Sequence, residues 1–159
     1  MSDHVVTISV NGVERSDSVP ARLTLADFLR ERLDLTATHL ACEHGVCGAC
    51  TVLVDGETAR ACLLLTVQAD GSEVTTLEGL TAGDELGPIE QSFWAKHGMQ
   101  CGFCTPGFVM TISELLDDNP SPTRQEIIEG LGGNLCRCTG YVKIVEAVEE
   151  AVSLRGGGA

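Results

Sequence analysis

The sequence predicts a chain of two halves, an α+β half over residues 1–78 and a helical half over residues 79–159. β-Branched residues and turn dipeptides dominate the first half, beginning with the run 4–10 and Asn11-Gly12. A stretch rich in Gly, Pro and acidic residues over 79–88 is typical of a linker. Beyond it apolar residues recur at helical spacing, and each half contains four cysteines.

The first half should contain a hairpin, one helix and a second hairpin. Asn11-Gly12 favours a two-residue type I′ turn, and Asp55-Gly56 is a second turn of the same kind. Leu25, Phe28 and Leu29 recur at helical spacing behind Thr24, whose hydroxyl can cap the first turn. In chain order we expect a strand over 4–10 and its hairpin, a helix over 24–33, a strand over 51–54, its return over 57–66, and a strand over 72–77.

The second half should be all helical. Pro106 fits a first helical turn, and the Asn119-Pro120 step ends the helix that it opens. Ser121 or Thr123 can cap the next helix. We expect helices over 89–97, 107–118, 123–131 and 141–154, followed by a flexible glycine-rich tail from residue 156.

Composition narrows the possible functions before any motif is considered. The formal net charge is −13 over 159 residues, which disfavours binding to nucleic acid and favours proteins or neutral cofactors as partners. The first ten residues do not resemble a secretion signal, and no apolar run is long enough to span a membrane, so we expect a cytoplasmic protein. In that reducing compartment eight cysteines indicate metal binding, redox chemistry or simple burial rather than disulfides.

The first cysteine set has the spacing C-x4-C-x2-C-x11-C, which is typical of plant-type [2Fe-2S] sites. Gly45 and Gly48 suit a loop that wraps around a cluster and leaves N–H groups free to donate to sulfur. A zinc site prefers paired C-x2-C knuckles, so zinc and buried free thiols are the weaker alternatives. The set consists of Cys42, Cys47, Cys50 and Cys62.

His44 lies inside this set and raises the question of a Rieske-type centre. Such a centre needs a second His directly after the later cysteine pair, and residue 51 is Thr. We therefore expect His44 to face solvent or to shield sulfur rather than to bind iron.

The second set joins a C-x2-C pair to a C-x-C pair, with 31 residues between the two pairs. A thioredoxin-like dithiol would need βαβ surroundings, and these neighbours are helical. Both pairs precede predicted helices, whose N-termini would stabilise an anionic cluster. The spacing thus favours a second iron–sulfur centre, with zinc as the main alternative. The set consists of Cys101, Cys104, Cys136 and Cys138.

The motifs over residues 42–50, 100–107 and 133–141 together resemble the iron–sulfur subunit or domain of the xanthine oxidase family of molybdenum hydroxylases. This resemblance covers residues 4–152. It implies a β-grasp, plant-ferredoxin-like domain with one [2Fe-2S] cluster on the first set. It further implies a four-helix bundle with another [2Fe-2S] cluster on the second set.

The same resemblance implies an electron-transfer role between partner subunits. Gln100 is expected to hydrogen-bond the molybdopterin of a large subunit, and Cys138 to lie near it on the electron path. Electrons would pass to FAD on a medium subunit or to an external acceptor, in a dimer of heterotrimers, with no substrate chemistry on this chain. The alternatives are an independent ferredoxin, which does not need the second cysteine set, and a zinc-stabilised interaction module.

Overall fold

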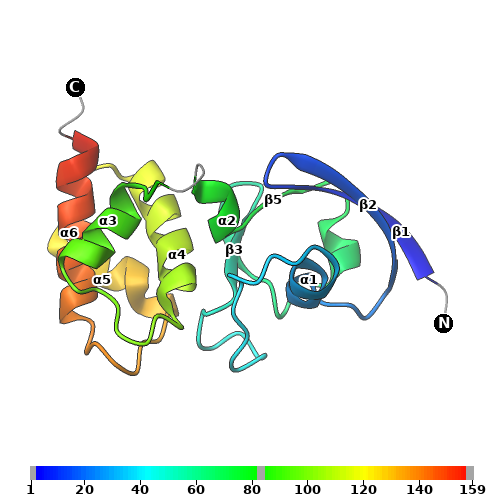
Figure 1. Ribbon diagram of the computed structural model, residues 1–159, viewed down its shortest axis with the longest axis horizontal. Helices are drawn as coiled ribbons and strands as arrows, with labels where there is room; N and C mark the ends of the chain where they lie inside the picture. Colours follow the sequence, from blue (N-terminus) through cyan, green and yellow to red (C-terminus); the bar gives the residue numbers. More distant parts are fainter. Residues whose placement is uncertain (1–2, 82–84, 157–159) are drawn as a thin grey trace.

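The computed structural model describes residues 3–81 and 85–156, and its two parts lie side by side (Figure 1). One part is a five-stranded sheet in the order β2-β1-β5-β3-β4, in which only the β1–β5 pair is parallel. The other part is helical. The strands are β1 (Asp3–Val10), β2 (Val13–Pro20), β3 (Thr51–Val54), β4 (Glu57–Arg60) and β5 (Glu73–Thr75).

Both predicted hairpins are confirmed. Asn11 and Gly12 have φ values of 52° and 74°, and Asp55 and Gly56 have values of 52° and 88°. A positive φ at both central residues is what a type I′ turn requires, and its twist matches that of the flanking strands. The two dipeptides therefore fix the registers of β1 with β2 and of β3 with β4.

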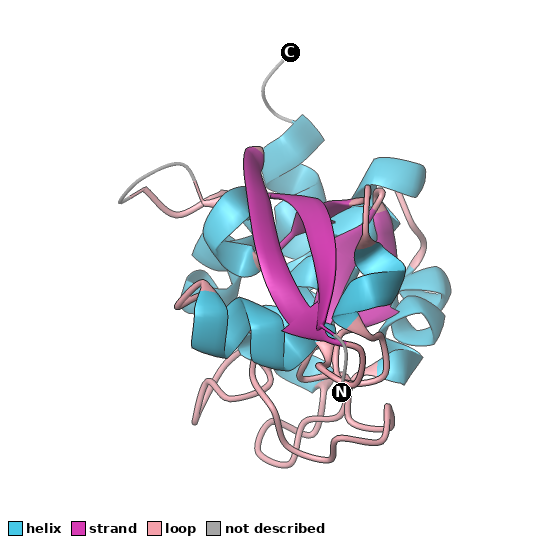
Figure 2. Ribbon diagram, turned by 90° about the vertical axis from the view of Figure 1, so that its right-hand side faces the viewer, coloured by secondary structure: helices cyan, strands magenta, loops and turns pink. Residues whose placement is uncertain are grey.

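A short helix covers one face of this sheet (Figure 2). The Thr24 hydroxyl accepts the Asp27 N–H at 3.1 Å, as a helix N-cap does. The predicted helix over 24–33 lies in the expected place, but it is built from α1 (Leu25–Asp27) followed by a π-helix, η1 (Phe28–Arg32). The first core forms beneath it from Val6, Ile8, Val10, Val19, Leu25, Ala26, Phe28, Leu29, Val52, Ala61, Ala69 and Val74, together with Cys50 and Cys62.

The predicted return strand over 57–66 is wrong beyond Arg60. The Ala61 carbonyl oxygen accepts the Ala26 N–H at 3.1 Å, and the Leu64 carbonyl oxygen accepts the Leu25 N–H at 2.7 Å. The backbone of this segment therefore bonds to α1 instead of β3, and it continues into the 3₁₀ helix η2 (Thr66–Ala69). The expected strand over 72–77 is shorter than predicted, because a helix that the sequence analysis missed, α2 (Leu77–Leu80), follows β5.

The four predicted helices of the second half are confirmed, with ends shifted by one or two residues. Thr123 rather than Ser121 is the N-cap of α5, where its hydroxyl accepts the Glu126 N–H at 3.3 Å. Gly156, where the tail was expected to begin, is the last residue of α6, and the rest of that expected tail, residues 157–159, lies outside the described range. The helices are α3 (Pro88–Ala95), α4 (Thr105–Asp118), α5 (Arg124–Gly130) and α6 (Val142–Gly156), with the 3₁₀ turn η3 (Leu131–Gly133) after α5.

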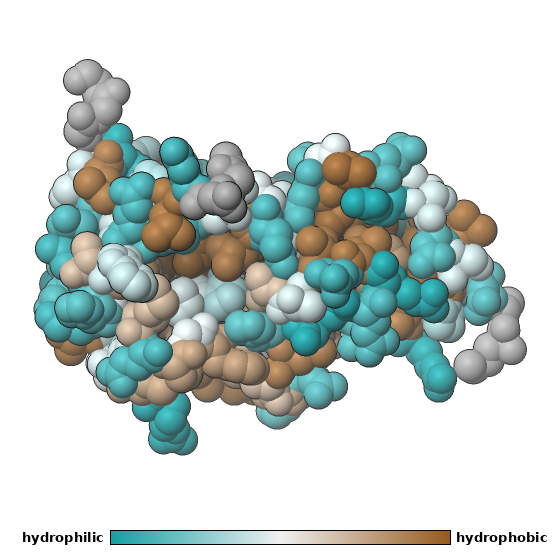
Figure 3. Space-filling model, in the orientation of Figure 1, coloured by the Kyte–Doolittle hydropathy of each residue, from teal (hydrophilic) through white to brown (hydrophobic). Residues whose placement is uncertain are grey.

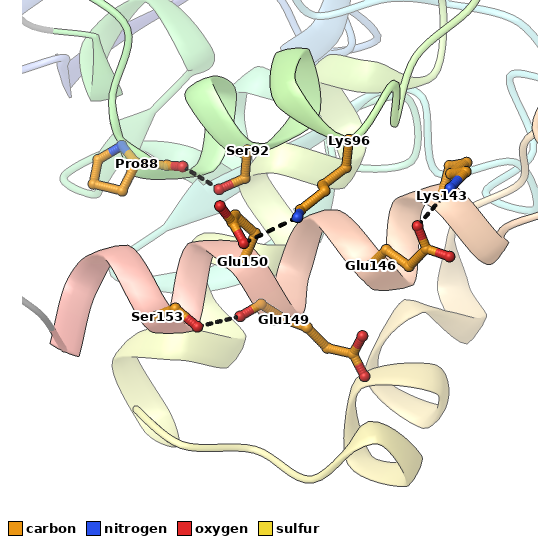
Figure 4. Close-up of polar contacts among 8 residues, drawn as sticks. All are labelled: Pro88, Ser92, Lys96, Lys143, Glu146, Glu149, Glu150 and Ser153. Atoms are coloured by element: carbon orange, nitrogen blue, oxygen red, sulfur yellow. Dashed lines mark hydrogen bonds and ion pairs between the residues drawn. The ribbon is translucent and has the colours of Figure 1, made fainter.

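Helices α3 and α6 pack against one another, with a polar seam on their outer side (Figure 4). Lys96 and Glu150 form an ion pair across this seam at 3.2 Å. The second core lies inside, and it includes Phe93, Phe108, Ile112, Leu116, Ile127, Ile144 and Val148. The linker expected over 79–88 is partly occupied by α2, and residues 82–84 lie outside the described range. None of the described helices is long and apolar enough to cross a membrane.

Candidate metal centres

The loops that carry the two cysteine sets lie at the same end of the molecule in both ribbon views (Figures 1 and 2). The cyan loop of residues 36–50 comes from the sheet part, and the lime and orange loops of residues 97–104 and 132–141 come from the helical part. These loops carry every cysteine except Cys62, so both sets have members at this end of the molecule.

The first set is assembled by the β3–β4 hairpin and the loop before it. Cys50 directly precedes β3, and its carbonyl oxygen accepts the Ala61 N–H at 3.2 Å, which brings Cys62 alongside. Both of these side chains are buried. On the loop, the Cys47 N–H donates to the Cys42 sulfur over 3.4 Å, the kind of bond that stabilises a thiolate ligand.

The thiols of this set differ in acidity. Backbone N–H groups of His44 and Cys47 lower the pKa of Cys42 to about 6, so this sulfur is prepared to be a thiolate. Burial raises the pKa of Cys50 to about 11. Metal binding has to displace the Cys50 proton against this raised pKa, whereas the lowered pKa of Cys42 makes its thiolate easier to form.

His44 behaves as expected from the sequence. Its side chain is exposed, and Nδ1 hydrogen-bonds to the Cys42 carbonyl oxygen. This contact braces the loop around the first set.

The second set lies between the starts of α4 and α6, as predicted. Cys104 is the N-cap residue of α4, and burial raises the pKa of its thiol to about 12. The Cys138 thiol donates to the Cys101 sulfur over 3.5 Å. Burial opposes ionisation of Cys136, but the Thr139 hydroxyl, 3.1 Å from the sulfur, helps to lower the pKa of this thiol.

The eight thiols interact in four pairs. Within residues 3–81 and 85–156, no three Cys, His, Asp or Glu side chains converge as a single metal ion requires. Two thiolates on each of two irons match a [2Fe-2S] cluster, whereas zinc needs four ligands around one point. The pairs are Cys42 with Cys47, Cys50 with Cys62, Cys101 with Cys138, and Cys104 with Cys136.

One buried hydroxyl also points to a missing acceptor beside the second set. Thr105 follows Cys104 directly, and its Oγ1 is the only buried side-chain oxygen or nitrogen in the described residues without a hydrogen-bond partner. Such an orphaned donor calls for an explanation, and the sulfur atoms of a bound cluster would provide one. The residues present thus fit the group that the spacing predicts.

A polar network that the sequence analysis missed joins the two sets. Asn134, only 2% exposed, donates from Nδ2 to the Gly48 carbonyl oxygen at 3.0 Å and accepts from the Thr111 hydroxyl at 2.9 Å. Arg60 donates to the Gly133 carbonyl oxygen at 2.7 Å and to the Thr51 hydroxyl at 2.6 Å. Because the partners are up to 86 residues apart, no local pattern could have revealed these bonds.

A second contact between the parts involves His39. Its ring stacks on that of Phe103 with centroids 4.6 Å apart, and its Nδ1 lies 2.7 Å from the Phe103 carbonyl oxygen. Since Phe103 lies between Cys101 and Cys104, this contact holds the second set against the sheet part.

The second set opens onto a partly apolar surface. Cys101 and Cys138 are exposed, as are Phe103 and Leu135, at 45% and 49%. Gln100 is also exposed, beside a groove that it lines with Phe93, Trp94, His97 and Met99. Figure 3 shows apolar colours along the lower edge of the helical part, the end at which these loops lie.

The fold and the two thiol sets define a protein with two [2Fe-2S] domains, and comparison with known proteins supports this class. Residues 8–81 match the 2Fe-2S iron–sulfur cluster binding domain, and residues 76–149 match a second family, the [2Fe-2S] binding domain. The nicotine 6-hydroxylase small subunit of Paenarthrobacter nicotinovorans is 55% identical over 94% of this chain and 91% of its own length. The caffeine dehydrogenase subunit gamma of Pseudomonas sp. (strain CBB1) is 51% identical over the same shares.

Solved structures agree in fold. A chain of quinoline 2-oxidoreductase from Pseudomonas putida 86 superimposes with a TM-score of 0.93 at 44% identity, covering 100% of both chains. Aldehyde oxidoreductase from Desulfovibrio gigas gives a TM-score of 0.92 at 40% identity, with 98% of this chain matching 18% of that one.

The chain therefore belongs to the small iron–sulfur subunits of the xanthine oxidase family of molybdenum hydroxylases. It is an electron-transfer subunit with two [2Fe-2S] clusters and not an independent ferredoxin. The β-grasp and helical-bundle fold expected from the resemblance is confirmed.

Proposed function

We propose that the first cysteine set holds the cluster nearer the electron exit, and the second set the cluster nearer the molybdopterin of a large subunit. Residues 1–78 and 79–159 are the corresponding domains. The observation that carries this assignment is the difference in exposure. Cys50 and Cys62 are buried within the chain, whereas Cys101 and Cys138 lie at its surface.

The second set is therefore the less enclosed of the two within this chain. A large partner seated over Phe103 and Leu135 would supply the missing enclosure, since apolar side chains exposed together favour a protein interface. Gln100, on the same surface, is available to hydrogen-bond the molybdopterin.

We propose an N-heteroaromatic compound as substrate of the holoenzyme. Nicotine, caffeine and quinoline, which appear in the names of three of the relatives, are all N-heteroaromatic. We also propose a medium FAD subunit, a dimer of heterotrimers and a cytoplasmic location, where eight free thiols would stay reduced until they bind iron. Co-purification of the complex followed by identification of its chains tests the assembly.

Iron and acid-labile sulfide analysis of the purified chain tests whether both cysteine sets hold a [2Fe-2S] cluster. About four irons and four sulfides per chain are expected for two [2Fe-2S] clusters. About two of each would contradict the second set as a cluster site, and zinc without sulfide would contradict both.

Two substitutions separate the roles on the exposed surface. Cys138→Ser should leave the spectrum of the first cluster intact and stop reduction of the chain by substrate in the complex. Gln100→Ala should slow that reduction while both clusters remain loaded. Gln125→Ala, an exposed change on α5, is the control. Normal reduction of both clusters by substrate in either variant would contradict the assignment.

A further inference from the structure

The loop that carries Cys47 and the loop that carries Cys136 contact each other through their backbones. The Leu135 N–H donates to the Cys47 carbonyl oxygen at 2.9 Å. Leu135 directly precedes Cys136, so one hydrogen bond and the covalent bonds of Cys47, Leu135 and Cys136 connect a thiol of the first set to a thiol of the second.

Asn134 holds this stretch in place from both sides. Its amide donates to the Gly48 carbonyl oxygen and accepts from Thr111 on α4, so each end of the side chain has a partner. The side chain is buried, where a fully satisfied polar group contributes rigidity and a lost partner is costly. The amide thus ties the residue after Cys47 to a helix of the other domain.

Glycines make the close approach possible. A Cβ on Gly48 would lie 2.5 Å from the Gly133 carbonyl oxygen and 2.7 Å from the Asn134 Nδ2 atom. Gly48 also has a φ of 71°, a value that other residues rarely adopt. A side chain at this position would therefore push the two loops apart.

We propose that Asn134 is the positioning residue that sets the separation and the electronic coupling of the two clusters. This inference rests on the proposed ligand sets. It concerns a one-electron transfer in which no bond forms or breaks and no proton moves. An electron passing between clusters held by the two sets would cross the Leu135–Cys47 hydrogen bond, and the Asn134 amide would keep that bond short.

The test is electron paramagnetic resonance of the full-length chain with both clusters reduced by dithionite. Two nearby paramagnetic centres split each other's signals, so the splitting reports their separation independently of turnover. The variants are Asn134→Leu, which removes both amide bonds, and Thr111→Val, which removes only the bond to α4. Thr111→Ser keeps a hydroxyl and serves as the rescue, and Asn119→Leu at the far end of α4 is the control.

We expect Asn134→Leu to keep about four irons per chain and both individual signals, but to lose the splitting. Thr111→Val should weaken it, whereas Thr111→Ser and Asn119→Leu should keep it. An unchanged splitting in Asn134→Leu with both clusters loaded would overturn the inference. Loss of one cluster from both Asn134→Leu and Thr111→Val would also overturn it, because the residue would then act on assembly. Absence of two clusters from the unmodified chain would instead contradict the proposed ligand sets.

Discussion

The backbone N–H of Cys136 donates to the phenol oxygen of Tyr141 at 3.0 Å. Tyr141 also packs edge-on against Phe108 of the second core, with ring centroids 6.3 Å apart. The second thiol set is thus anchored to the core through the one tyrosine of the chain.

Replacing Tyr141 with Phe should loosen the loop that carries Cys136. The aromatic contact with Phe108 would remain, but the Cys136 N–H would lose its partner, at a cost of about 1 kcal/mol in unfolding free energy. We expect a faster loss of the second cluster to an iron chelator, followed by the decay of its resonance signal. The first cluster is the internal control. If the second cluster were lost at the same rate with and without the substitution, Tyr141 would not stabilise the loop that carries Cys136.

Gly107→Ala should disrupt the contact between the two domains. A Cβ at this position in α4 would lie well inside van der Waals distance of the Gly48 carbonyl oxygen. Overpacking against backbone costs about 1–3 kcal/mol, which chemical denaturation would detect.

Gly132→Ala is the matched control for this substitution. Apart from Gly132 itself and its chain neighbours, no atom lies within 4 Å of the added Cβ, so we expect no loss of stability and a gain of up to about 1 kcal/mol from the restricted unfolded chain. If both variants changed the unfolding free energy by the same amount, the close approach of the two domains at Gly107 would not explain the effect of Gly107→Ala.

Thr105→Val should leave the stability of the iron-free chain unchanged but alter the second cluster. The hydroxyl has no partner within the described residues, so its removal should not destabilise the chain without iron. In the loaded chain, loss of a donor to sulfur should lower the reduction potential of the second cluster. A potentiometric titration followed by resonance spectroscopy checks this, and an unshifted potential would mean that the hydroxyl does not face the cluster.

The N-terminus of α5 should show a defined response to acid. The Thr123 hydroxyl and backbone N–H both donate to Glu126 and lower the pKa of its carboxyl. A lowered pKa stabilises the folded state above the unfolded pKa, and this contribution is lost as the pH falls through the folded pKa. The difference in unfolding free energy between the unmodified chain and Glu126→Gln should therefore be constant at neutral pH and disappear in acid.

A double-mutant comparison identifies the source of this response. In a Thr123→Ala background the hydroxyl bond is absent, so the pH-dependent part of the Glu126→Gln effect should shrink. If the pH-dependent part of the Glu126→Gln effect did not shrink, other charges on the chain would be its source.

Local chemistry explains why much of the fold could be predicted from the sequence. Asn11-Gly12 and Asp55-Gly56 define their turns whatever surrounds them, and Thr123 with Glu126 forms a capping box from residues three apart. Cysteine spacing likewise indicated two sets of four thiols, and the structure brings the members of each set together in pairs. The assignment of these thiols as ligands stays a prediction for the iron and sulfide analysis.

The misses have long-range causes. The predicted strand beyond Arg60 was diverted by bonds from Leu25 and Ala26, more than 30 residues earlier in the chain. In the sequence Asn134 resembles an ordinary loop residue. Only the assembled domains show that its amide nitrogen and its amide oxygen both have hydrogen-bond partners. Secondary-structure propensity and residue spacing describe neighbours along the chain, so they do not predict contacts between two domains.

The two hydrophobic cores come from separate, contiguous stretches, residues 6–74 and 89–151. During synthesis the N-terminal core can therefore close before the second core has left the ribosome, since domains fold as units in the order of their synthesis. At that stage the Gly48 carbonyl oxygen has no Asn134 to bind, and the loop around Cys42 and Cys47 is open on that side. This order of events would let iron enter the first set before the second half closes over its loop.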